Sequence, residues 1–149
     1  NFGEVTEILE KLDNWLASIS FHSLERINPY QFAKDMNLNE RDVLSLFLVA
    51  SKEQLFRISY EVVSDENEYL GFISEEQYKK FKFENGTLQM YSRDYDSEVE
   101  IYDHNIELWF SLLIKPIKVP ENIIYSKKED ASPLKSNELD DLYIKLMGR

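Results

Sequence analysis

The stretch from Asn28 to Val63 constrains the fold more than any other part of this chain, because two capped helical segments are followed directly by an alternating one. Asn28 is a good helix cap, and Pro29 suits the first helical position. Gln31 is placed to complete a capping box. We expect this first helix to end near Met36, with a tight turn after it.

The second helix of this stretch begins at the cap Asn39 and extends to about Gln54. Its apolar residues lie around most of its circumference, which predicts a largely buried helix. From Phe56 to Val62 apolar and polar residues alternate, which predicts a strand with one buried face. Two short helices, a turn and a strand are the outline of a winged-helix or helix-turn-helix module. Such modules bind nucleic acid or other proteins.

Amphipathic helices are predicted at both ends of the chain. Residues 4–20 place their apolar side chains on one helical face. Asn137 can cap a last helix, and four residues three and four positions apart form its apolar stripe: Leu139, Leu142, Tyr143 and Leu146. We expect the first helix and this stripe to face a partner, the alternative being that the last helix packs on its own domain.

The region between these helices is predicted to form a small antiparallel sheet. Ser74 and Gln77 form a capping box that opens a short helix to about Lys80. Asn85-Gly86 is the strongest hairpin signal in the chain. Further strands are expected from Glu98 to Tyr102 and from Ile106 to Leu112, with a turn between them.

The fold class that follows is α+β, with a winged-helix-like helical half packed on a small antiparallel sheet and flanked by amphipathic helices. The predicted boundaries are residues 1–63 for the helical region, 64–120 for the β region, 121–136 for a charged linker, and 137–149 for the last helix.

The composition narrows the possible functions. The chain of 149 residues has no cysteine, which excludes disulfides, thiolate metal sites and cysteine nucleophiles. No segment approaches the roughly 20 apolar residues that span a bilayer, and no signal-peptide pattern begins the sequence. We therefore expect a cytoplasmic protein without membrane contact. The net charge of −11 repels phosphate backbones and anionic surfaces.

The charge is unevenly distributed. Residues 61–110 contain 13 acidic and 4 basic residues, whereas residues 28–60 contain four of each. A DNA reader presents several basic side chains on its recognition helix and wing. Here that surface has Arg41 and Lys52 on the second helix and Arg57 on the next strand. DNA binding through these three residues is the alternative function, and it is disfavoured by charge relative to a protein partner or self-association.

The run NPYQFAKDMNLNERDVLSLFLVASKEQLFRISYEV resembles a domain of unknown function found beside the catalytic domains of some class III adenylate cyclases. The resemblance covers roughly residues 27–116 and implies an accessory or regulatory module. In that family a zinc-ribbon-like part with two Cys-x-x-Cys knuckles follows. The knuckles would fall near Ser64–Asn67 and Met90–Asp94, where this chain has no cysteine, so the resemblance implies no zinc site here.

No arrangement of residues indicates catalysis. The alternating acids Asp94, Asp96, Glu98 and Glu100 lack the glycine and glutamate of a calcium loop, which favours a solvated face over a cation site. Neither His22 nor His104 has a second ligand residue at the sequence spacing of a zinc site. The sequence also contains no motif of a catalytic nucleophile or of a phosphate-binding loop. Tyr91, Tyr95 and Tyr102 lie among acids, which favours a protein-facing surface or sheet packing over base stacking. We therefore expect a non-enzymatic protein that needs no cofactor or metal.

Overall fold

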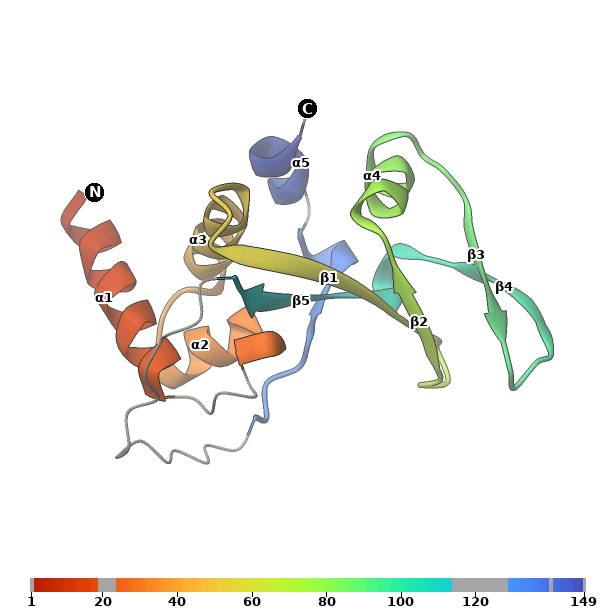
Figure 1. Cartoon of the computed structure of the whole chain (residues 1–149), viewed down its shortest axis with the longest axis horizontal. Coiled ribbons are helices and arrows are strands. Elements are labelled where there is room, and N and C mark those ends of the chain that lie inside the picture. Colours follow the sequence, from red (N-terminus) through yellow and green to blue (C-terminus); the bar gives the residue numbers. More distant parts are fainter. Residues whose placement is uncertain (1, 19–23, 114–128, 140, 149) are drawn as a thin grey trace.

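The computed structural model describes residues 2–18, 24–113, 129–139 and 141–148, with only the backbone for residues 2–5. The molecule is elongated, with α1–α3 at one end and a two-stranded ribbon at the other (Figure 1). The elements follow in the order α1 (Phe2–Ser18), α2 (Pro29–Met36), α3 (Glu40–Lys52), β1 (Phe56–Val63), β2 (Tyr69–Ile73), α4 (Glu75–Phe83), β3 (Leu88–Ser92), β4 (Ser97–Ile101), η2 (Asp103–Asn105), β5 (Ile106–Leu112), β6 (Leu134–Lys135), η3 (Ser136–Leu139) and α5 (Leu142–Met147). The predicted α+β class is confirmed.

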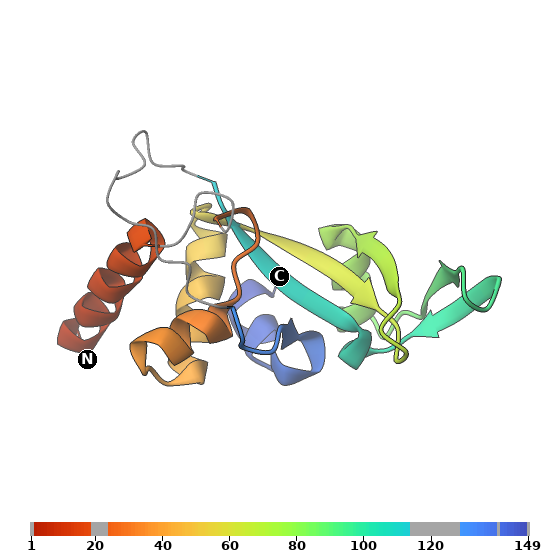
Figure 2. The ribbon, with the colours of Figure 1, turned by 90° about the horizontal axis from the view of Figure 1, so that it is seen from below.

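The strands β1 and β5 form the centre of the main sheet. They pair antiparallel from Phe56 opposite Leu112 to Val62 opposite Ile106. β2 pairs with the far half of β1, and β6 pairs with β5, giving the order β2-β1-β5-β6. The predicted helical region contains β1 and the predicted β region contains β5, so the two regions share one sheet. β3 and β4 form a separate ribbon, and α2 and α5 lie on one side of β1 and β5 (Figure 2).

Aromatic side chains connect the first three helices to the sheet. Phe47 of α3 stacks on Phe56 of β1, with ring centroids 4.9 Å apart. Phe110 of β5 meets Phe47 edge-on at 5.2 Å, and Phe32 of α2 lies 5.2 Å from Trp15 of α1. All five rings are buried. Such pairs each contribute about 0.5–1.5 kcal/mol beyond the burial of their area, so this row fixes the helices on the sheet.

The predicted outline of α2, α3 and β1 is confirmed, together with both caps. The side chain of Asn28 accepts from the N–H of Tyr30, and that of Asn39 accepts from Asp42. The predicted capping role of Gln31 is wrong. Its Oε1 instead accepts from the N–H groups of Asp130 and Ala131, because that distant segment packs against α2. The function of this outline as a winged helix stays a prediction.

The helix after β2 is longer than its sequence predicts. The capping box of Ser74 and Gln77 is present, but α4 extends to Phe83. The predicted hairpin at Asn85-Gly86 is therefore wrong, because the residues before it belong to a helix. Asn85 has φ 50° just beyond that helix. The ribbon turns later, between β3 and β4, where Asp96 has φ 49°.

The described part of the predicted linker belongs to the fold. Leu134 is buried and pairs with β5. The side-chain amide of Asn28 donates to the carbonyls of Ala131 and Ser132. Residues 129–136 are therefore not a free tether, which corrects the linker boundary, and residues 121–128 lie outside the described part of the chain.

Three buried tyrosines join α4 and α5 to β1. The rings of Tyr60 and Tyr78 stack with centroids 4.3 Å apart, and Tyr143 meets Tyr78 edge-on at 5.2 Å. The hydroxyls of Tyr60 and Tyr143 lie 2.9 Å apart. Burial raises the pKa of Tyr60, Tyr78 and Tyr143, because the apolar surroundings disfavour the phenolate.

A buried lysine holds α4 to the C-terminal segment. The Lys82 side chain is only 8% exposed, and its Nζ donates to both carboxylate oxygens of Asp103 at 3.1 and 2.9 Å. It also donates to the carbonyl of Ser136 at 3.1 Å. The Ser136 hydroxyl donates in turn to Asp103. These contacts connect three segments that are far apart in the sequence.

Candidate functional site

Two turns meet at the end of the molecule opposite α1. The turn between β1 and β2 spans residues 64–68, and the turn between β3 and β4 spans residues 93–96. Asn67 and Asp96 have left-handed backbones, with φ 67° and 49°, a conformation that asparagine and aspartate tolerate better than most residues. The Ser64 hydroxyl accepts from two N–H groups of its own turn, which fixes its shape.

Glu68 joins the two turns. Its Oε1 accepts from the Ser92 hydroxyl at 2.7 Å, and its Oε2 accepts from the N–H of Arg93 at 2.9 Å. A second connection is made by Tyr95, whose hydroxyl donates to Glu66 at 2.9 Å. Residues that are 24 and 29 positions apart are thereby held in one surface.

The helical turn η2 closes the third side of this surface. Oδ1 of Asp65 accepts from the side-chain amide of Asn105 at 2.9 Å and lies 2.7 Å from Nε2 of His104. Asn105 also donates to the carbonyl of Val63. The ring of His104 stacks on Tyr102. His104 is thus engaged with a carboxylate and a ring, and His22 lies outside the described residues.

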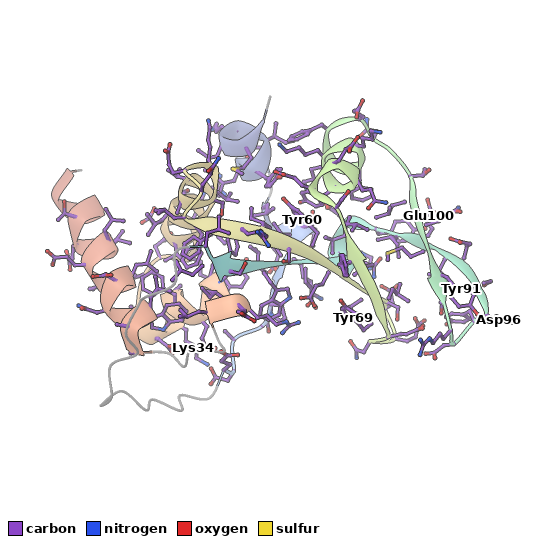
Figure 3. The ribbon with its side chains drawn as sticks, viewed as in Figure 1. Lys34, Tyr60, Tyr69, Tyr91, Asp96 and Glu100 are labelled. Carbon is purple, nitrogen blue, oxygen red and sulfur yellow. The ribbon has the colours of Figure 1, made fainter. Side chains whose placement is uncertain are left out.

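A hollow of about 170 Å³ lies between these elements. Its lining combines apolar residues with acids and aromatic rings: Leu70, Val99, Ile101, Glu66, Glu100, Tyr95 and Tyr102. In Figure 3, Tyr69, Tyr91, Asp96 and Glu100 lie at this end, far from Lys34 on α2. We name residues 64–69 and 91–104 the acidic surface.

Exposed tyrosines alternate with carboxylates on the acidic surface. Four of them are more than half exposed: Tyr69, Tyr91, Tyr95 and Tyr102. The hydroxyl of Tyr91 donates to Asp96 at 2.5 Å, and that of Tyr102 donates to Glu100 at 3.0 Å. The carboxylates therefore hold the rings in place.

Hydrogen bonds in the acidic surface raise the pKa of tyrosines and lower the pKa of two of its carboxyl groups. The bond to Asp96 raises the pKa of Tyr91, because a donated proton is harder to remove. The Ser92 hydroxyl and the N–H of Arg93 hold the pKa of Glu68 below its usual range, against partial desolvation. The hydrogen bond to His104 lowers the pKa of Asp65 in the same way. With lowered pKa values, the Glu68 and Asp65 carboxylates are ionised at neutral pH.

A hollow of this kind suits a cationic side chain. Ammonium and guanidinium groups are attracted to carboxylates and to the faces of aromatic rings, whereas phosphate is repelled. Between positions 61 and 110 there are 13 acidic residues against 4 basic ones, so the wider electrostatic field is also negative. Among the described residues, no group of three or more histidine, cysteine, aspartate or glutamate side chains is placed to hold a metal ion.

The basic residues predicted for DNA binding are dispersed. Arg41 and Lys52 lie at opposite ends of α3, about 16 Å apart along its axis at 1.5 Å per residue. The Arg41 guanidinium lies 3.9 Å from the Asp141 carboxylate. Arg57 lies on β1. Because this distance along α3 separates them, Arg41 and Lys52 do not form a single basic patch.

The residues predicted to face a partner at the C-terminus lie in the core instead. Leu139 and Tyr143 are fully buried, Leu142 is 6% exposed, and Leu146 is partly buried against the same core. This corrects the partner-facing expectation, because β6 and η3 lead α5 back onto α3 and the tyrosine cluster. The last helix packs within its own domain.

Comparison with known proteins gives one match. A family model with the description "Family of unknown function (DUF5939)" matches residues 4–118. No curated protein and no solved structure matches the chain. In the described residues, no helix is long and apolar enough to cross a membrane.

Proposed function

The chain belongs to the DUF5939 family, and from its geometry we propose that it is a non-enzymatic protein-interaction or regulatory module that binds a basic segment of a partner protein on its acidic surface. The observation that carries this proposal is the pair of turns joined by Glu68, which hold carboxylates and tyrosine rings around one hollow. A rigid arrangement of rings and charges is what recognition of a lysine or arginine side chain needs.

The sequence resemblance supports an accessory role. It relates residues 27–116 to a domain beside cyclase catalytic domains and places two Cys-x-x-Cys knuckles near Ser64–Asn67 and Met90–Asp94. Those two positions lie at the two turns of the acidic surface. In this chain, which has no cysteine, the Glu68 carboxylate joins the two turns through Ser92 and Arg93.

The test is calorimetric titration of the 149-residue protein with an oligo-arginine peptide, with an oligo-glutamine peptide as the neutral reference. We expect salt-sensitive binding of the basic peptide only. The double variant Glu98→Gln/Glu100→Gln is expected to bind about three- to tenfold more weakly, because it removes two charges from the acidic surface. The matched control Glu40→Gln/Glu53→Gln removes two charges at α3 and is expected to keep the affinity.

An equal loss in both double variants would show that only net charge matters and would overturn the proposed site. The alternative function is tested in the same series with duplex DNA at low ionic strength. Tighter binding of DNA than of the peptide, lost on Arg41→Glu and Lys52→Glu, would replace the proposal with a winged-helix regulator.

A further inference from the structure

Within the described part of the chain, the half of β1 next to α3 is paired on one side only. β5 accompanies β1 from Phe56 to Val62, whereas β2 pairs only from Tyr60 onward. In the described residues, no strand lies on the β2 side of Phe56–Ser59. Figure 1 shows this half of β1 between α3 and β2. We call Phe56–Ser59 the open edge.

The register directs backbone polar groups to the open edge. Opposite residues of an antiparallel pair alternate between exchanging hydrogen bonds and facing away from each other. Phe110, opposite Ile58, exchanges its hydrogen bonds with Ile27 on the far side of β5. Ile58 therefore points its N–H and C=O away from β5. The next residue of this set, Tyr60, meets Ile73 of β2, but no described strand lies beside Ile58 on the side away from β5.

Two hollows border the open edge. One has a volume of about 520 Å³ and lies beside the end of β2, where it reaches Phe72 and Ser74. The other, of about 180 Å³, reaches α3, Leu113 and Met147 of α5. Both are lined by Arg57, Ile58, Tyr60 and Glu75. The open edge therefore lies beside a notch, formed by these two hollows, with room for side chains of an added strand.

We propose that this notch accepts an extended basic segment of a partner protein, which pairs with the open edge as an additional strand. Four residues of edge span about 13 Å at 3.3 Å per residue, which suits a short peptide. The inference rests on the proposed protein-binding function and gives the partner a second contact, formed by main-chain hydrogen bonds.

Charge and shape favour a basic peptide over a second copy of this chain. Arg57 and Glu75 line both hollows, but Glu61 adds a second carboxylate to the larger one, and the net charge of −11 attracts basic segments and repels another copy. Phe72 is 75% exposed beside the notch and offers an apolar contact. The open edge also lies between α3 and β2, which limits how closely two identical edges can approach each other (Figure 1).

The test uses nuclear magnetic resonance on the full chain titrated with a synthetic peptide of alternating lysine and valine. Shifts of the Phe56–Ser59 amides, with slower hydrogen exchange at Ile58, are the expected result. Shifts confined to the acidic surface would overturn strand addition and leave the proposed function standing. An absence of shifts at both places would overturn both.

Variants separate edge pairing from charge attraction. Ile58→Pro removes the N–H that faces the notch but leaves the ladder to β5 intact, since that N–H does not take part in it. We expect about tenfold weaker binding of the peptide, whereas Ile58→Val is expected to bind as the parent does. If Ile58→Pro does not fold, Glu75→Arg gives the decision. This variant is expected to bind the lysine-valine peptide more weakly and a threonine-valine peptide unchanged. If Glu75→Arg and the parent protein bind the lysine-valine peptide with equal affinity, the notch is not the binding site.

Discussion

Replacing Lys82 by methionine is expected to destabilise the fold by about 3 kcal/mol, although the volume of the side chain is nearly kept. Hydrogen bonds to charged groups contribute about 1.5–3 kcal/mol each. Lys82 makes such bonds to Asp103 and to the carbonyl of Ser136. The Asp103 side chain is 39% exposed, so water can replace part of the hydrogen bonding that it loses. We therefore take the lower end of the range, about 1.5 kcal/mol, for the contact with Asp103.

Ser136 is fully buried, and its carbonyl would lose the ammonium donor. A buried acceptor without a partner costs about 1–3 kcal/mol, which together with the Asp103 contribution gives the expected total. For a chain of this size the midpoint of thermal unfolding should fall by about 6–12 °C. Urea unfolding followed by circular dichroism measures the same loss through the midpoint at unchanged slope.

The matched control is Lys80→Met on the same helix. Lys80 is 68% exposed and only approaches Glu76 one turn away, so its replacement should change stability by no more than about 0.5 kcal/mol. Equal unfolding midpoints for the two variants would refute the reasoning. The unfolding midpoint of Asp103→Asn should lie between those of Lys82→Met and Lys80→Met, because asparagine keeps a hydrogen-bond acceptor but loses the charge.

Four further outcomes are expected. Burial raises the pKa of Tyr60, Tyr78 and Tyr143, so the stability that these groups give is complete below about pH 10 and is lost as the pH rises beyond it. Tyrosinate absorbance should therefore rise cooperatively with unfolding. A smooth titration of all tyrosines in the folded chain would contradict this expectation. The pKa of Glu68 is lowered, so its link between the turns is present at neutral pH and is lost as the pH falls through that lowered value. The Arg93 amide resonance should shift over that acid range in the parent protein, and Glu68→Gln should abolish this shift. Gly71 has φ 124° and its added Cβ would lie 3.4 Å from the methyl carbon of Met90, so Gly71→Ala should cost about 1–3 kcal/mol of unfolding free energy, and an unchanged urea midpoint would count against it. A chain ended at residue 118, where the family match ends, should fail to fold, because Leu134, Leu139 and Tyr143 fill the core; a cooperative melt of that fragment would show otherwise.

The elements that the sequence predicted correctly are those set by local signals. Asn28, Asn39 and Ser74 cap the helices that they were expected to begin, and the alternation from Phe56 matches β1. The hairpin at Asn85-Gly86 failed because a left-handed asparagine serves equally well after a helix and inside a tight turn. Packing of α4 on the tyrosine cluster decided between these two uses, and that packing has no local signature.

The candidate site was only partly visible in the sequence. Its acids and tyrosines could be located, because the charge is concentrated between residues 61 and 110. The contacts of Glu68 with Ser92 and Arg93 could not, since they join turns 24 and 25 residues apart. The burial of Leu139 and Tyr143 was missed for a similar reason. An apolar helix stripe has the same spacing whether it covers its own core or a partner.

The pairing of β1 with β5 has a consequence for how this protein can change. The acidic surface is built entirely from residues between these two strands, so it is an insert between neighbouring strands of the sheet. Doubling the length of such an insert costs only about 0.6 kcal/mol of closure entropy. Its turns can therefore be lengthened, shortened or recharged while the β1–β5 ladder and the helices on it stay as they are. The β1–β5 framework and the acidic surface are therefore free to evolve at different rates.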